Sequence, residues 1–540
     1  MRLTRSLLPL LFALPAAGED QKTVPTVHDF SSAEGQTPFV FRRRQKAVEK
    51  PELKDGRLQM LFGRAEHKTS VGFERTASGA YRRIDARFTL SLKGQNEGAC
   101  FALLRTGRFD HKGLVWDPQP PRKTSPELLA TPDWAEPNLK DSLAVGFDVR
   151  NPKDEDWFNE NGNFYGRPER EVSLHFDGVE RANALCPAEL ATGEPVAVRV
   201  LVEFVAGGAE VTVTVGEATV YDRHFLAHVL PYESRVGFGA HGTGEGFLDD
   251  VSVKFEQPAV HTPAPIRVEA IRRGWVYPRH GTDTREVDLL PAEFATERIV
   301  ATITYRPPMA RDFWDRKSAV YVWDDAGTRV EIARVTTPFM LFGRSYRYDV
   351  DVSNFAPLLF GRRKMAVMVG SNVARGFLVD LDLAYYRKSD DLPPRPRAFS
   401  VQTLWSGNAH FNKKDHLKNF FAPRTVAVPD GAKRALVRIC VSGHGVMEFT
   451  ELGRTLTVNG EEFRNQLWKT DCYLNPHRPQ FGTWKFDRAG WQPGGIVEPW
   501  VVDISHVLAA GTLKIGYAPD TFEAKKWASH WVEAQVVFFN

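Results

Sequence analysis

Two short segments near the C-terminus combine residue types that could do acid–base chemistry on a sugar. The segment 442–449 places Glu448 among small residues, and the motif Asp-Arg-Ala-Gly-Trp at 487–491 places Arg488 close to Trp491. Most glutamates are solvated surface residues, so Glu448 alone would indicate little. A carboxylate, a guanidinium and indole faces together suit a groove that holds a sugar and exchanges protons with it.

A second carboxylate with this potential lies upstream in Trp314-Asp315-Arg316, directly before the alternating run 318–323. An aspartate at the mouth of a strand and next to an arginine is expected to have a lowered pKa and to stay ionised. An ionised carboxylate can activate water or attack an acyl carbon. The alternative interpretation is a structural Asp–Arg pair at a domain edge.

The elements that must position these residues are strands. Apolar and polar residues alternate in several runs, typical of half-buried strands, at 210–215, 319–323, 437–440 and 455–458. Turn signals rich in glycine punctuate the chain at 206–208, 325–327 and 458–460. The 42 glycines and 35 prolines fit many tight connections. We therefore predict an all-β chain of sandwiches or jelly rolls.

The chain is long enough for two to four domains, since its 540 residues exceed what one core supports. Two proline-bearing connectors divide it. We predict a signal peptide at 1–18, a β-sandwich at 19–258, a linker at 259–265, a jelly roll at 266–390, a linker at 391–397 and a second jelly roll at 398–540. No catalytic candidate lies in 19–258, so we expect that segment to be dispensable for the chemistry.

The order of strands in the segment 19–258 resembles the concanavalin-type jelly roll of legume-lectin and laminin-G-like domains. That resemblance implies a glycan-binding role by analogy of fold. Oxygen ligands for a hard cation could come from four polar residues after the run 143–148, namely Asp148, Asn151, Asp154 and Asp156. The alternative interpretation of these four residues is a polar loop with an Asx turn.

The N-terminus has the pattern of an export signal, with a basic start, a short apolar core and small residues at 15–18. We expect a secreted or periplasmic protein without membrane insertion, since no apolar run is long enough to span a bilayer. The net charge of +3 on 70 basic and 67 acidic residues gives no indication of a nucleic-acid surface. Four cysteines could pair as one disulfide in each half, Cys100 with Cys186 and Cys440 with Cys472, although free buried thiols are the alternative.

From about residue 266 to 540 the motifs around Asp315, Glu448 and Arg488 resemble those of the peptide-N-glycosidase F family. The resemblance implies two jelly rolls side by side and hydrolysis of the amide between asparagine and the first N-acetylglucosamine of N-linked glycans. It further implies that Asp315 is the principal catalytic residue and that Glu448 orients water and substrate. Arg316, Arg488 and Trp491 are then expected to contact the substrate, which would be an N-linked glycoprotein or glycopeptide, and no cofactor is expected.

Two departures from the family pattern keep another function open. The family has a further acid in the strand that matches 367–372, where this chain has neither an acid nor an aromatic residue. Its cysteines near the glutamate are replaced by Val446 and Thr450. A secreted glycan-binding protein with a degenerate amidase site is therefore the main alternative, and glycoside hydrolysis by paired carboxylates is a further one.

Overall fold

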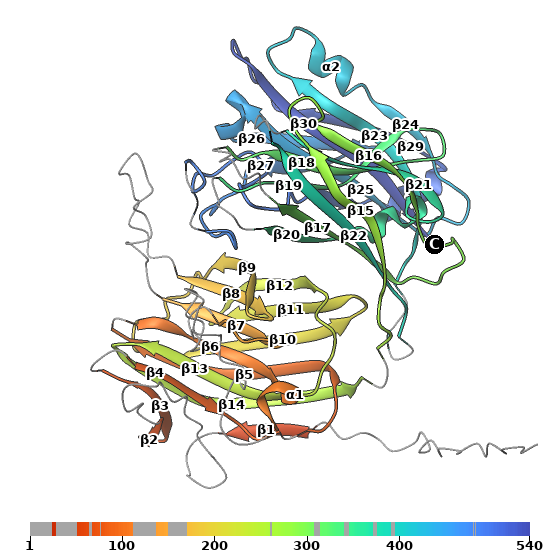
Figure 1. The fold of residues 1–540 in the computed structure, drawn as a ribbon. Coiled ribbons are helices and arrows are strands. Elements are labelled where there is room, and N and C mark those ends of the chain that lie inside the picture. The colour runs from red at the N-terminus through yellow and green to blue at the C-terminus, as the bar shows by residue number, and fades with distance from the viewer. Residues whose placement is uncertain are drawn as a thin grey trace, which may run out of the picture.

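Strands dominate the architecture of this protein (Figure 1). The computed structural model describes residues 24–28, 51–63, 67–75, 77–94, 96–111, 137–149, 170–259, 262–306, 314–339, 345–370, 375–389, 392, 395–478, 480 and 482–540. Its helical segments are one or two turns long, namely α1 (Thr106–Phe109), η2 (Ser353–Leu358), α2 (His416–Phe420), η3 (Val446–Phe449) and η4 (Ser505–Ala510). The prediction of an all-β fold is confirmed.

The N-terminal part is a sandwich of two antiparallel sheets around one apolar core. The larger sheet has the order β12 (Ala218–Ala227), β11 (Gly208–Val215), β10 (Val196–Val205), β5 (Tyr81–Lys93), β14 (Glu245–Pro258), β3 (Arg57–Phe62) and β2 (Glu52–Lys54), and β1 (Val24–His28) pairs with β14. The smaller has the order β4 (His67–Gly72), β13 (Ser234–Gly242), β6 (Asn96–Arg105), β7 (Leu143–Asp148), β8 (Glu171–Phe176) and β9 (Val179–Leu185). Phe88, Phe101 and Phe238 pack between the sheets, with ring centroids 4.9–5.8 Å apart.

The next part is built from two four-stranded sheets with its own core. One has the order β15 (Ile266–Val276), β22 (Phe377–Tyr386), β17 (Arg298–Arg306) and β20 (Tyr346–Asp351). The other has the order β16 (Thr282–Asp288), β21 (Arg362–Val369), β18 (Lys317–Trp323) and β19 (Arg329–Thr336). Every neighbouring pair in both sheets is antiparallel, as expected for a jelly roll.

The C-terminal part repeats this plan around a third core. One sheet has the order β23 (Ala398–His410), β30 (Ala528–Phe539), β25 (Arg434–Gly445) and β28 (Trp500–Asp503), and the other β24 (Arg424–Ala427), β29 (Thr512–Pro519), β26 (Leu452–Val458) and β27 (Glu461–Leu467). The turn from β26 to β27 uses Asn459 and Gly460, both with positive φ, which is the two-residue hairpin expected from an Asn-Gly pair.

The two jelly rolls lie side by side and share a buried polar contact. Arg334 of β19 forms an ion pair with Glu331, and its Nη1 donates to the carbonyl oxygen of Trp531 on β30 at 2.7 Å. The guanidinium also stacks over the Trp531 ring at 3.9 Å. Ala319 and Tyr321 of β18 and Ala366 of β21 pack around Trp531. One sheet of each jelly roll therefore packs directly against the other through these residues.

The N-terminal sandwich docks against the first jelly roll along β12 and β20 (Figure 1). The Arg298 guanidinium lies 3.8 Å from the centroid of the Phe225 ring. His228, at the end of this edge of the sandwich, bonds Tyr386 through Nδ1 and approaches Asp349 at 3.2 Å through Nε2. This interface is partly apolar and partly charged.

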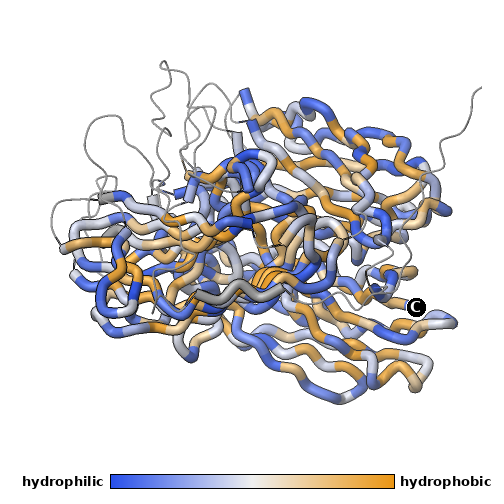
Figure 2. Tube along the Cα trace, turned by 90° about the horizontal axis from the view of Figure 1, so that it is seen from below, coloured by the Kyte–Doolittle hydropathy of each residue, from blue (hydrophilic) through white to orange (hydrophobic). Residues whose placement is uncertain are grey.

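Figure 2 shows apolar and polar residues alternating along the strands, as half-buried sheets require. No helix in the described part of the chain is long and apolar enough to cross a membrane. Of the weak metal candidates, Asp148 ends β7 opposite Glu171, whereas Asn151, Asp154 and Asp156 lie outside the described residues, as does the predicted signal peptide. Within the described ranges no group of three His, Cys, Asp or Glu residues could hold a metal ion.

Candidate functional site

The predicted site residues come from both jelly rolls. Asp315 and Arg316 directly precede β18 of the first jelly roll, and Glu448 lies on the turn η3 of the second. Arg488 belongs to a short antiparallel bridge with Lys469, in which the two residues exchange backbone hydrogen bonds of 2.8 and 3.1 Å. The charges of Arg488 and Glu448 both act on the Asp315 carboxyl. The structure therefore gathers Asp315, Glu448 and Arg488 at the junction of the jelly rolls.

Glycines bring Glu448 into this position. Gly445 ends β25 with φ +67°, and a side chain there would lie 2.4 Å from the carbonyl oxygen of Trp527. At Gly443 a side chain would lie 2.3 Å from the carbonyl oxygen of Met447. Only glycine allows the chain to turn back this closely. The small residues that surround Glu448 in the sequence are thus required by the turn that presents it.

Arg488 is completely buried and holds Glu448. Its Nε donates to Glu448 Oε1 at 3.1 Å, and Nη1 donates to the carbonyl oxygens of Thr483 and Phe486 at 2.6 and 2.9 Å. Nη2 donates to the Thr483 hydroxyl at 2.8 Å. Since most of its N–H groups are used inside the protein, Arg488 fixes the glutamate, and direct donation to a glycan stays a prediction.

Asp315 has the most unusual environment of the three. Its Oδ2 atom is buried and accepts no hydrogen bond from the described residues. Burial raises the pKa of Asp315 to about 7 and the charge of Glu448 adds to the rise, although Arg488 and Arg316 oppose it. The sequence-based expectation of a lowered pKa was therefore wrong, because desolvation outweighs the two arginines. A carboxyl that titrates near neutrality and has an unused oxygen is suited to proton transfer.

The pKa of Glu448 is also raised by burial, and the hydrogen-bonded Arg488 acts in the opposite direction. About a quarter of the Glu448 side chain remains exposed. Glu448 is thus an acid that is anchored on one side and accessible on the other.

The remaining two predicted substrate contacts differ in accessibility. Arg316 is half-buried, and its backbone N–H donates to the Thr337 hydroxyl at 2.8 Å, which fixes the start of β18. Trp491 is only 3% exposed, its Nε1 donates to the carbonyl oxygen of Gly443 at 2.8 Å, and its ring packs 5.0 Å from the Arg488 guanidinium. Of the two roles expected for such an indole, stacking or packing, this conformation shows packing.

Aromatic faces open to solvent are found instead on residues that the sequence analysis did not select. Trp314, Phe449, Phe486 and Trp527 are each at least 40% exposed. Trp314 precedes Asp315, Phe449 follows Glu448, and the Phe449 and Phe486 rings lie edge to face at 6.2 Å. For Trp314, Phe449 and Phe486 the signal in the sequence was an acid at the adjacent position, whereas Trp527 has no such neighbour. Exposed rings beside polar groups suit the apolar face of a sugar.

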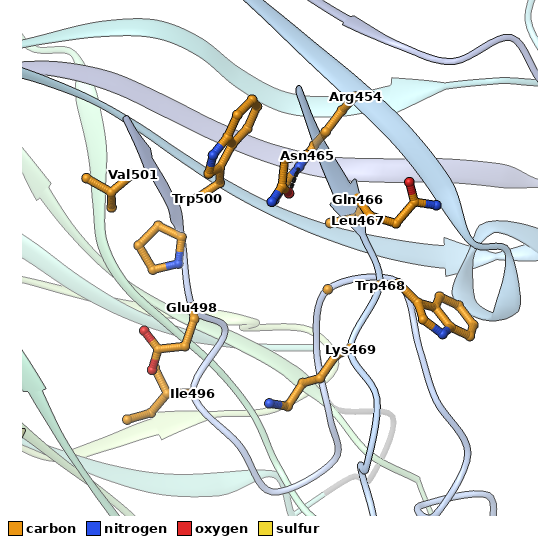
Figure 3. Close-up of a pocket in the computed structure, with 12 residues that line it drawn as sticks. Arg454, Asn465, Gln466, Leu467, Trp468, Lys469, Ile496, Glu498, Trp500 and Val501 are labelled. Atoms are coloured by element: carbon orange, nitrogen blue, oxygen red, sulfur yellow. Dashed lines mark hydrogen bonds between the residues drawn. The ribbon is translucent and has the colours of Figure 1, made fainter. Parts of the chain in front are cut away.

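A cavity of about 350 Å³ lies behind Arg488 rather than at Asp315 or Glu448. The segments 465–469 and 496–501 form two facing walls of this cavity (Figure 3). Lys469 and Gly490, which both form backbone hydrogen bonds with Arg488, line this cavity. Neither Asp315 nor Glu448 lines the cavity. The candidate site, defined by these two acids, therefore lies at the junction of the jelly rolls and outside the cavity.

No disulfide bond links the described residues of this region. Cys440 and Cys472 are buried thiols whose Sγ atoms donate to the carbonyl oxygens of Val497 at 3.6 Å and Lys469 at 3.4 Å. The disulfide considered between these two cysteines is therefore not formed, and hydrogen bonds hold the loops around Arg488.

Comparison with known proteins shows which proteins this chain is similar to. Residues 410–537 match the family model "Peptide-N-glycosidase F, C terminal". The predicted resemblance to that family is confirmed. A 252-residue stretch is 27% identical to peptide-N(4)-(N-acetyl-β-D-glucosaminyl)asparagine amidase F of Elizabethkingia miricola, covering 42% of this chain and 69% of the relative.

Solved structures give weaker likenesses. A glycosylasparaginase, peptide-N-glycosidase F of Flavobacterium meningosepticum, is 19% identical with a TM-score of 0.46, covering 52% of this chain and 96% of that protein. Peanut lectin is 16% identical with a TM-score of 0.29, covering 44% of this chain and 98% of the lectin.

Proposed function

We propose that the protein is an exported amidase that releases N-linked glycans from glycoproteins or glycopeptides. It would hydrolyse the amide between asparagine and the first N-acetylglucosamine, and the asparagine would become aspartate. The observation that carries this proposal is Asp315, a carboxyl with a pKa of about 7 that is influenced by the charges of Arg488 and Glu448 and whose buried Oδ2 accepts no hydrogen bond from the described residues. The matched family model and the homologous amidase support the same reaction.

In the proposed mechanism Asp315 accepts a proton from water as the water oxygen bonds to the amide carbon. Glu448, held by Arg488, orients the water and the substrate. The carbon–nitrogen bond then breaks, and the proton returns to the leaving nitrogen, so that the products are an aspartyl peptide and a glycosylamine. The mechanism calls for no cofactor, because preorganised charges stabilise the developing oxyanion.

The test is incubation of the mature protein with a purified glycopeptide, followed by mass spectrometry of the peptide. The proposal predicts loss of the glycan and an aspartate at the former glycosylation site. Asp315→Asn should retain the fold and give no release, because an amide cannot take up the proton. A glycopeptide cut between sugars instead would indicate a glycoside hydrolase.

The alternative is a secreted glycan-binding protein. It is favoured by the exposed aromatic residues around the site and by the missing family acid, since Val367 and Val369 are buried apolar residues of β21. If high-mannose, complex and core-fucosylated glycopeptides all stay intact while calorimetry detects binding, this alternative replaces the amidase.

A further inference from the structure

Arg488 owes its orientation to the described residues of the segment 470–486, which are 470–478, 480 and 482–486 and are here called the support loop. Two of the three groups in the loop that accept hydrogen bonds from its guanidinium belong to Thr483, and the third is the carbonyl of Phe486. These contacts leave Nε directed at Glu448. A shift of the support loop would therefore move Arg488 and, through it, the carboxylate of Glu448.

The support loop is itself anchored at several points. Asn475 and Gln480 both donate to the carbonyl oxygen of Pro493, at 2.5 and 2.9 Å. The His477 ring packs between Tyr346 and Tyr348 of the first jelly roll at 5.6 and 5.4 Å. The loop therefore packs against both jelly rolls.

One anchor reaches the N-terminal sandwich. Arg478 Nη1 donates to Glu171 Oε2 at 2.5 Å, and Nη2 donates to Glu171 Oε1, which gives a two-point contact. Glu180 on the neighbouring strand β9 approaches the same guanidinium at 3.8 Å. Glu171 is 1% exposed and belongs to β8, which is paired on both sides. A planar fork held by a buried carboxylate is a rigid attachment.

Loss of the Glu171 charge would leave the half-buried Arg478 guanidinium with the more distant carboxylate of Glu180, at 3.8 Å, which destabilises the contact locally. Of the two sides of this contact, we expect the support loop to move when the ion pair is lost, since Glu171 lies in a strand that is paired on both sides. Arg478 would then leave the interface to reach water, and the loop would move with it.

From these contacts we infer that Glu171 is a positioning residue for the reaction, acting through Arg478 and the support loop on Arg488 and Glu448. The inference rests on the proposed function and deepens it, because it makes the lectin-like domain part of the catalytic apparatus. It also runs against the expectation that residues 19–258 are dispensable.

The experiment compares full-length wild type with Glu171→Gln at a temperature well below unfolding. We expect kcat on a glycopeptide to fall roughly 10- to 100-fold with KM changed about threefold or less, since a misplacement of about 1 Å can cost about 10²-fold. Hydrogen exchange should become faster in residues 470–490. Arg478→Lys, which keeps the charge and loses the fork, should give a smaller loss of kcat.

A matched control is Glu210→Gln. Glu210 pairs with Arg223 and approaches Arg298 across the same interface at 3.7 Å, and within the described residues no hydrogen bond or ion pair joins it to the support loop. We expect this variant to keep wild-type kcat and wild-type exchange in 470–490, even if its melting temperature falls.

Two results would overturn the inference. One is a Glu171→Gln variant with a lower melting temperature but unchanged kcat and loop exchange, which would make the pair purely structural. The other is an Arg478→Lys variant indistinguishable from wild type in kcat and loop exchange, which keeps the test open if Glu171→Gln does not fold. Hydrogen exchange is measured without substrate, so it tests the coupling between Glu171 and the support loop even if wild type is inactive. Inactivity of wild type would contradict the amidase proposal alone.

Discussion

Asp315→Asn should abolish glycan release and make the folded protein more stable at neutral and alkaline pH. The fold raises the pKa of Asp315 from 3.8 to about 7, so ionisation of this carboxyl opposes folding. Its contribution to stability is complete below about pH 4 and is lost as the pH rises through about 7. The two pKa values differ by an amount worth about 4 kcal/mol, because one unit is about 1.4 kcal/mol. That figure is the upper bound of the gain from Asp315→Asn.

The assay is urea unfolding of wild type and Asp315→Asn at several pH values between about 4 and 8, with release from a glycopeptide measured in parallel. The stability difference should grow from near zero at about pH 4 and level off above about pH 7. In wild type, kcat/KM should rise with pH through an apparent pKa near 7, since the ionised form accepts the proton. Asp325→Asn, at an exposed turn of the same jelly roll, is the control and should change neither property.

Two results would refute this reasoning. A stability difference that does not depend on pH would show that Asp315 ionises in the fold as it does in the unfolded chain. Undiminished turnover by a variant with native melting would remove Asp315 from the mechanism altogether.

Three further changes have expected outcomes. Glu448→Gln should lower kcat far more than glycan affinity, and the acid limb of the pH profile should move to lower pH, because the Glu448 charge helps to raise the pKa of Asp315. Glu533, buried beside a second carboxylate, has a pKa raised by burial from 4.5 to about 8, so its stabilising contribution is present below about pH 4.5 and lost as pH rises through about 8. The free energy of unfolding in urea should therefore fall less for Glu533→Gln than for wild type as the pH rises through about 8. An equal fall with pH in both proteins would contradict this. Trp314→Ala should raise KM about 2- to 10-fold, as expected for a lost stacking contact of about 0.5–1.5 kcal/mol, whereas the same change at the distant exposed Trp275 should have no effect.

The sequence was sufficient to predict the fold class and the convergence of Asp315, Glu448 and Arg488. Alternation with a period of two marks strands such as β18 and β26 without knowledge of the tertiary structure. The three site residues were found because the motifs around them resemble those of the peptide-N-glycosidase F family. Alternating runs and short motifs of this kind can be recognised in a single sequence, because they involve residues close together in the chain.

Properties that depend on distant segments could not be predicted in the same way. The pKa of Asp315 is set mainly by its burial and also by the charges of Arg488 and Glu448, which lie far away in the sequence, so the neighbouring Arg316 was a misleading guide. The packing of Trp491 follows from its place behind Arg488. The contact between Glu171 and Arg478 joins residues 307 positions apart, and no periodicity reports such a pair.

The two acids differ in a way that assigns their roles. Both are partly removed from water, which raises both pKa values, but only Glu448 has a guanidinium hydrogen-bonded to it. Arg488 favours the charged form of Glu448. That charge repels an ionised Asp315, whose Oδ2 accepts no hydrogen bond from the described residues. When environments separate two carboxyls in this manner, the less supported one exchanges the proton and the other stays charged. The proposed mechanism therefore assigns the proton transfer to Asp315, whose pKa is raised to about 7 mainly by burial and further by the Glu448 charge, against the opposing charge of Arg488.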